Sequence, residues 1–161
     1  MELKSENRVF VKRGLVNIQE SDRAGINALI ETAGIAGKKI TSGNVSFTLV
    51  PRINAVGRLG FSGKSVSLLL TDDENEAMSI AKQLNEDNNE RKEIEKNILM
   101  KIDEMVKANP HITNDRVLVI DGEGWHQGVI GIVAAKVKEF FGKLLLLFPV
   151  TEKRQRLGQK C

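Results

Sequence analysis

The chain has 161 residues, of which 41% are hydrophobic and 28% are charged, with a net charge of +3. A chain of this length and composition can form one domain or two small lobes with a hydrophobic core, which argues against disorder. Its single cysteine, Cys161, excludes an internal disulfide and a cysteine-based metal site. There is no signal-peptide-like start, and the longest purely apolar run is Leu144–Phe148, so we expect a cytoplasmic protein that is neither secreted nor membrane-spanning.

The first 72 residues form the first predicted lobe. Their hydrophobic runs predict, in chain order, a short strand, a helix that ends at a glycine C-cap, a second strand and a further buried segment, over Val9–Val11, Ile26–Gly34, Val45–Val50 and Ser65–Leu70. Pro51 directly follows the second strand. We therefore expect residues 52–58 to form a loop at the strand's end.

The clearest predicted element is a long helix between two lobes. No proline or glycine occurs from about Glu74 to Ala108, and apolar residues recur there at spacings of three and four. Polar residues dominate Asn85–Glu93, so we expect the middle of this helix to be exposed, as in a strut. The following Asn109-Pro110 ends the helix.

The second lobe shows the pattern of a βαβ unit. A strand over Arg116–Asp121 leads through a glycine-rich turn into a helix, and Leu144–Phe148 forms the next strand. The predicted buried face of that helix consists of Ile130, Val133, Ala134, Val137 and Phe141. Gly142 ends the helix, and the two strands should be parallel. A lone βαβ unit is too small for a layered domain, so this lobe should be incomplete.

The chain has few candidates for a metal site. Hydrolysis of a phosphodiester commonly uses divalent cations held by clustered aspartates and histidines. Neither His111 nor His126 has an acidic neighbour at ligand spacing, and Asp72-Asp73 is more readily interpreted as a helix cap. Asp121, at the end of a predicted strand, could be catalytic in another setting, but it is more readily interpreted as a turn or cap residue. The sequence therefore predicts no metal site in this chain.

Two arginines form the first candidate for phosphate binding. Arg52 and Arg58 flank Asn54 and Gly57 in the predicted loop after Pro51, which could present both guanidinium groups to one phosphodiester. The alternative is that one or both arginines pair with surface acids. Both interpretations remain open at this point.

The turn before the second lobe's helix is the other candidate. Its glycines would expose backbone N–H groups at the positive end of the helix dipole, and His126 could donate to a phosphate oxygen. The alternative is a tight strand-to-helix connection in which Gly128 and Gly131 permit close packing and Trp125 seals the core. The six phenylalanines lie in apolar runs and are predicted to be core residues rather than base-stacking residues.

Several strings along the chain resemble the middle of the RecJ exonucleases, of the DHH phosphoesterase superfamily. They are NRVFVKRGL, AGINALIETAGI, FTLVPRINAVGRLG, AKQLNEDNNERKEIEKNI and WHQGVIGIVAAKVKEFFGK, which occur in the same order as in that family. The resemblance covers about residues 7–143. It implies an α/β fold in which residues 1–72 end a DHH-type lobe, 73–109 form a linking helix, 110–150 begin the DHH-associated domain as an incomplete βαβ unit, and 151–161 form an atypical tail.

The resemblance also implies a function. RecJ-type enzymes digest single-stranded DNA from 5′ to 3′ with Mn²⁺ or Mg²⁺ in recombination and repair, and Arg52, Asn54 and Arg58 match the family's arginine motif facing the cleft. Trp125, His126 and Gly128 match a motif on the opposite side of that cleft, while Gly57 and Trp125 are expected to support the two sites. The family's upstream metal-binding motifs are absent from this sequence.

Beyond Lys143 the sequence departs from the family, which continues with a proline, a strand and a basic glycine-serine motif. The tail resembles a frameshifted or prematurely ended one. We therefore expect an internal piece of an exonuclease that is inactive alone and contributes substrate-cleft residues. The alternatives are a nucleic-acid-binding or interaction module, docking on single strands or on a separately encoded catalytic lobe, and a non-functional remnant of a disrupted gene.

Overall fold

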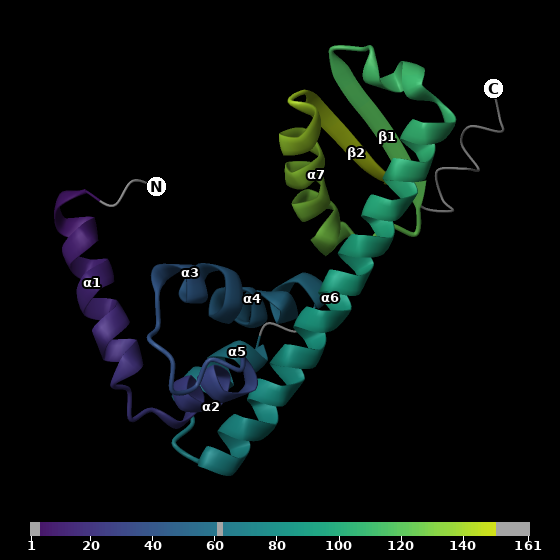
Figure 1. Ribbon diagram of the computed structural model, residues 1–161. Coiled ribbons are helices and arrows are strands. Elements are labelled where there is room, and N and C mark those ends of the chain that lie inside the picture. The colour runs from purple at the N-terminus through teal and green to yellow at the C-terminus, as the bar shows by residue number, and fades with distance from the viewer. Residues whose placement is uncertain (1–3, 61–62, 151–161) are drawn as a thin grey trace. The chain divides into compact units, whose positions relative to one another are not determined.

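The computed structural model describes residues 4–60 and 63–150. The chain divides into two compact units, Met1–Asn89 and Glu90–Cys161, and the helix α6 (Glu74–Ala108) contributes its first half to one and its second half to the other. Figure 1 labels the helices and strands of both units.

All helices and no strands make up the regular elements among the described residues of the first unit. Its elements besides the start of α6 are α1 (Ser5–Gln19), α2 (Ala24–Thr32), α3 (Ser42–Asn44), a π-helical segment (Val45–Leu49), α4 (Val50–Leu59) and α5 (Gly63–Leu70). In Figure 1, α2, α4 and α5 gather beside the first half of α6. The buried residues that join them are Ala28, Leu29, Ile35, Leu49, Val56, Leu68, Ala77, Ala81 and Leu84.

Both strands predicted in the first unit are wrong. Val9–Val11 lies within α1, and Val45–Val50 forms the π-helical segment and the first residue of α4. Short apolar runs do not distinguish a strand from a helix, and β-branched residues favoured the strand interpretation. The capping box between Thr41 and Asn44 starts the helical path that overrides this local preference.

Pro51 lies in the first turn of α4 rather than at the end of a strand. Proline has no N–H group and cannot complete an α-helical hydrogen bond to the residue four positions earlier. The preceding turn is correspondingly wider, with the Val50 N–H donating to the carbonyl of Val45, five residues back. The predicted loop over residues 52–58 is therefore wrong, because these residues continue the helix.

The helix predicted to end at Gly34 is confirmed as α2. Gly34 has a φ of +70°, and its N–H donates to Glu31 while the Ile35 N–H donates to Ile30. These two bonds form a Schellman motif, which needs a left-handed residue at this place and so favours glycine.

The long helix is confirmed with the predicted bounds. Asp73 caps it, since its Oδ1 accepts from the N–H groups of Asn75 and Glu76, as predicted for the Asp72-Asp73 pair. The expectation that residues 85–93 are fully exposed is wrong. Asn88 is fully buried and Arg91 is only 9% exposed, because one stripe of the helix stays buried along this stretch.

The second unit contains the predicted βαβ unit. After the helix ends, a 3₁₀ turn (Pro110–Thr113) leads to β1 (Val117–Glu123), α7 (Gln127–Phe141) and β2 (Leu144–Val150). The strands are parallel and pair residue for residue from Val117 with Leu144 onward. Asp121 lies inside β1, so its interpretation as a turn or cap residue is wrong. Gly142 ends α7 in the left-handed conformation, as predicted.

One face of this two-stranded sheet is buried and the other is not. Leu118 and Ile120 of β1 are buried, and a core joins the sheet to α7 and the second half of α6 through Ile98, Ile102, Ile120, Trp125, Val129, Val133 and Val137. Figure 1 shows α7 running beside the sheet. Alternate residues project from the opposite face, where Val119 and Leu144 are more than half exposed.

Three phenylalanines depart from the prediction that these residues belong to the core, whereas Phe141 packs against the core of the second unit. Phe10, Phe47 and Phe140 are 73%, 84% and 83% exposed. All three lie in helical segments, where the helix period turns their side chains toward solvent. The predicted tail over residues 151–161 lies outside the described residues. No helix that the structure describes is long and apolar enough to span a membrane.

Candidate nucleic-acid interface

The helix α4 separates the two arginines that the sequence placed on one loop. Successive residues of an α-helix are rotated by about 100°, so Arg52 and Arg58 project about 120° apart. Asn54, Gly57 and Arg58 share one face and are exposed, with Asn54 and Arg58 one helical turn apart. Of the four predicted residues, these three form a surface, which we call the α4 surface, and Arg52 lies away from it.

Arg52 is half-buried and held within the first unit. Its Nε donates to Oδ1 of Asn85 at 3.0 Å and its Nη1 donates to the Thr48 carbonyl at 2.6 Å. Burial lowers the pKa of the Arg52 guanidinium below its ordinary value, since desolvation disfavours the charged form. Asn85, which sequence analysis did not select, therefore orients Arg52. An asparagine on the exposed-looking middle of a polar helix gave no signal of that role.

Arg58 lies in the last turn of α4, where its charge also complements the helix dipole. Gly57 has open space around the position that a Cβ would occupy, so packing does not require glycine there. A glycine in a helix interior costs about 1 kcal/mol relative to alanine. The α4 surface thus combines a guanidinium group, a side-chain amide and a stretch of backbone without a side chain, which are kinds of group that proteins use to bind phosphates.

His126 is the N-cap of α7. Its Nδ1 accepts the N–H of Gly128 at 3.1 Å, so the proton of the neutral ring lies on Nε2. The Gly128 N–H, which we expected to face a phosphate, donates to the imidazole instead. The ring is only partly exposed, and its Nε2–H remains as a donor at the positive end of the helix dipole.

Trp125 has the structural role predicted as the alternative. It is 5% exposed and belongs to the core of the second unit. A Cβ on Gly122 would lie 2.0 Å from its indole ring, so the glycine of β1 makes room for the tryptophan. Gly131, in contrast, has no atom within 4 Å of such a Cβ, and the prediction that it permits close packing is wrong.

The structure also contains an ion cluster that sequence analysis missed. Glu95 of α6 is bonded to Arg91 on the same helix at 2.7 Å and to Lys136 of α7. The Glu95 and Arg91 side chains are only 7% and 11% exposed, whereas the Lys136 side chain is 58% exposed. The four-residue spacing of Arg91 and Glu95 was visible in the sequence, but the pairing with Lys136 depends on how α7 packs on α6.

The residues that the structure describes do not fit a divalent cation. No group of three or more histidines, cysteines, aspartates or glutamates comes together among them. Hard cations such as Mn²⁺ and Mg²⁺ need several oxygen ligands. No catalytic step through a metal is therefore assigned to these residues.

Comparison with known proteins identifies the origin of these features. No protein-family model matches the sequence. The chain is 39% identical over 133 residues to the single-stranded-DNA-specific exonuclease RecJ of Thermus thermophilus, and 34% identical over 151 residues to RecJ of Escherichia coli. These matches include 83% and 91% of this chain. The resemblance to the RecJ exonucleases is confirmed.

Solved RecJ structures agree with this result. RecJ of T. thermophilus in complex with Mn²⁺ superposes with a TM-score of 0.77 at 36% identity over 90% of this chain. Another exonuclease RecJ bound to manganese gives 0.78 at 35% identity over 91%. The predicted α/β fold class, with its long helix and small parallel sheet, is therefore confirmed as that of a RecJ segment.

The chain is much shorter than these RecJ proteins. It spans 19% of the T. thermophilus sequence and 26% of the E. coli sequence, and 21% and 36% of the two solved chains.

Proposed function

We propose that this chain is the substrate-contacting part of a RecJ-type exonuclease, a cytoplasmic hydrolase that digests single-stranded DNA from 5′ to 3′ in recombination and repair. The observation that carries the proposal is the exposed α4 surface, Asn54, Gly57 and Arg58, in a chain whose relatives are named as single-stranded-DNA-specific exonucleases.

Each residue has a distinct role in this proposal. Arg58 pairs with a phosphate of the strand, and Asn54, one turn earlier on the same face, donates through its side-chain amide. Arg52 stiffens α4 against α6 through Asn85 and adds positive potential without direct access from the α4 surface. His126 donates from Nε2 to a phosphate oxygen, while Gly128 completes its cap and Trp125 supports the turn.

The chemical step needs more than the residues described. In the related structures Mn²⁺ or Mg²⁺ is bound, and such ions activate water and neutralise charge on the phosphate. Because the described residues gather no ligand group, the chain alone is proposed to be inactive. Its partners are single-stranded DNA and a catalytic lobe, which could be separately encoded.

Binding tests the α4 surface. We expect the 161-residue chain to bind a fluorescent oligothymidylate with an affinity that falls as salt rises, because cations on the protein displace counterions from the strand. Arg58→Gln should reduce the salt slope by about 1. Asn54→Ala should weaken binding without changing that slope, and Lys82→Gln, an exposed lysine elsewhere in the first unit, should change nothing. Equal effects of Lys82→Gln and Arg58→Gln would reject a specific α4 surface.

Cleavage and metal binding test the rest of the proposal. A 5′-labelled strand should stay intact when the chain and Mn²⁺ are added, and calorimetric titration of the chain with Mn²⁺ should release no saturable heat. Metal-dependent release of mononucleotides would overturn the proposed inactivity. Saturable Mn²⁺ binding without cleavage would instead place a metal site in this chain.

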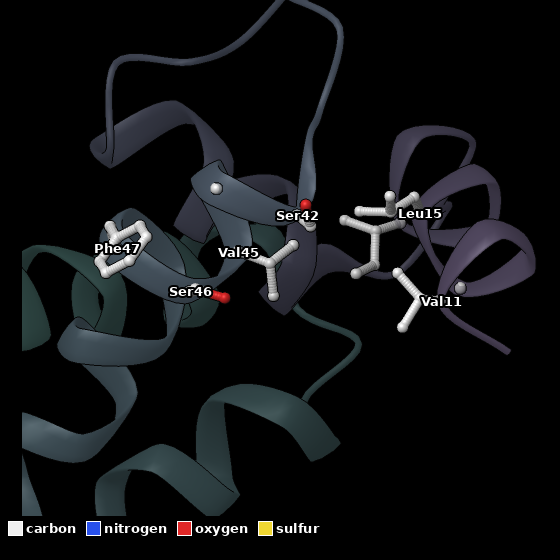
Figure 2. A pocket seen from close by; sticks show the side chains of 9 residues that line it. Val11, Leu15, Ser42, Val45, Ser46 and Phe47 are labelled. Carbon is white, nitrogen blue, oxygen red and sulfur yellow. The ribbon is translucent and has the colours of Figure 1, made fainter. Parts of the chain in front are cut away.

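A second candidate is an interaction module, favoured by a hydrophobic pocket in the first unit. The pocket of about 470 Å³ lies between α1 and the residues around α3. Figure 2 shows Val11 and Leu15 of α1 facing Val45, with Phe47 on the far side. Apolar pockets of this kind accept hydrophobic side chains of a partner.

Mixing experiments separate the two candidates. Co-elution of the chain with the remaining part of T. thermophilus RecJ, lost in Leu15→Glu, together with no binding of the oligothymidylate by the chain alone, would favour the interaction module. A chain without the far-UV circular dichroism of helices would favour the last alternative, a remnant of a disrupted gene with no role.

A further inference from the structure

Phe140 is a large aromatic residue that lies on the surface of the second unit and takes no part in its core. It lies near the end of α7 with 83% of its surface exposed. Its ring stands edge-to-face against Phe141, with the centroids 4.9 Å apart. Phe141 is partly buried and packs on the core, so it supports the Phe140 ring from one side, and most of that ring remains exposed to a ligand.

A groove runs from this ring along the surface between α6 and α7, entirely within the second unit. Its aromatic end is a pocket of about 250 Å³ formed by Leu99 and Ile102 of α6 with Val137, Phe140 and Phe141 of α7. A second pocket of about 560 Å³ continues it toward Arg91. Leu99, Asp103 and Lys136 line both pockets, so the two are continuous.

The groove has a net positive charge. Arg91, Lys92, Lys96 and Lys136 line it against the carboxylates of Glu95 and Asp103. Glu95 is bonded to two cations at once, so the cluster that it forms with Arg91 and Lys136 keeps one positive charge. The Asp103 carboxylate is bonded to Lys107 outside the groove. Lys92 and Lys96 are both exposed at the rim.

The distance between the aromatic ring and a nearby lysine of the groove suits one nucleotide. Lys136 and Phe140 are four residues apart on α7, which places their Cβ atoms about 5–6 Å apart on one face. This separation is comparable to that between a phosphate and its own base. A basic groove with an open aromatic ring is the combination by which proteins bind single-stranded nucleic acids.

We propose that the α6–α7 groove binds single-stranded DNA, with a base stacked on Phe140 and the adjoining phosphates on Lys136 and Lys96. The choice of single-stranded DNA rests on the proposed function, but the groove and the α4 surface share no residue. Glu95 positions Lys136 at the groove, since its buried carboxylate binds the ammonium group while the Lys136 side chain stays more than half exposed.

Photocrosslinking tests the proposal directly. The probe is an oligothymidylate of about 20 nucleotides with one central 5-iodouracil and a fluorescent label, bound to the full chain. We expect the crosslinked peptide to contain Phe140. Phe140→Leu keeps an apolar side chain at an exposed position but removes the ring. It should abolish the crosslink and raise Kd about fivefold or more, and Lys96→Gln should reduce the salt slope by about 1.

Matched controls and the site of crosslinking separate this proposal from the proposed function. Phe10→Leu, at a phenylalanine that is 73% exposed in the first unit, should leave Kd unchanged. Unchanged Kd in Phe140→Leu and Lys96→Gln would overturn the groove, and loss of binding in Arg58→Gln would then leave the proposed function standing. Loss of binding only in the groove variants would support the groove and reject the α4 surface. Binding of polyglutamate but not of the strand would show a protein-docking groove and overturn the proposal.

Discussion

The Nε of Arg52 donates to Oδ1 of Asn85 at 3.0 Å, which ties α4 to the first half of α6 within the first unit. The same guanidinium reaches back to the Thr48 carbonyl. Arg52 is thus a bridge between two helices, whereas Arg58, six residues later, lies on the exposed face. The two arginines of one short motif therefore have different roles.

Arg52 and Arg58 should separate stability from binding. Arg52→Ala removes two hydrogen bonds of a charged group and should lower the free energy of unfolding by about 1–3 kcal/mol, measured by urea unfolding followed by far-UV circular dichroism. Arg58→Ala should lower stability by less than Arg52→Ala does, because Arg58 is exposed, yet it should weaken strand binding. A larger loss of stability in Arg58→Ala and a larger loss of binding in Arg52→Ala would contradict the helical arrangement of α4.

Two substitutions of His126 should separate its cap from its contact with the strand. Asn accepts a hydrogen bond at an N-cap, so His126→Asn should keep stability near that of the wild type, and His126→Ala should cost about 0.5–2 kcal/mol. Both variants lose the Nε2–H and should bind the oligothymidylate more weakly. Full binding by His126→Asn would show that the imidazole only caps α7.

Gly122 should be intolerant of even one methyl group. A Cβ at this position would lie 2.0 Å from an atom of the Trp125 ring, which is too close for two carbon atoms. The Trp125 side chain is buried in the core of the second unit and cannot easily move away. Gly122→Ala should therefore cost about 1–3 kcal/mol and alter the emission of Trp125, the chain's single tryptophan. Gly131→Ala is the control: it meets open space in α7 and should stabilise the unit by about 0.5–1 kcal/mol.

Glu95 should contribute far more to stability than a carboxylate of similar spacing on the same helix. Glu95→Gln leaves Arg91 and Lys136 facing each other without the buried negative charge and should cost about 3 kcal/mol or more. Asp103 makes an exposed pair with Lys107 at 2.6 Å, and Asp103→Asn should produce no measurable change in the urea midpoint. Similar urea midpoints for Glu95→Gln and Asp103→Asn would show that solvent screens the charges of Glu95, Arg91 and Lys136.

Hydrophobic periodicity predicted the long regular elements correctly. The helix over Glu74–Ala108 and the βαβ unit followed from spacing, from the absence of helix breakers and from Pro110 and Gly142 at helix ends. It failed for Val9–Val11 and Val45–Val50, since three to six β-branched and apolar residues fit a strand and a helix equally. At Val45–Val50 the helix is favoured by the Thr41–Asn44 capping box and by burial of Leu49, whereas α1, which contains Val9–Val11, has neither a side-chain cap nor a buried residue.

The sequence by itself determined which residues are available, where the long elements begin and end, and the likeness to RecJ in the PRINAVGR and WHQGVIG segments. Only the tertiary structure decided which side of each helix those residues occupy. Arg52 is bonded to Asn85 within the first unit, and Phe140 is exposed on the surface of α7. Glu95 of α6 forms an ion pair with Lys136 of α7. The physical reason is that helix rotation and packing against distant segments set exposure, and neither is encoded in the spacing of a single short motif.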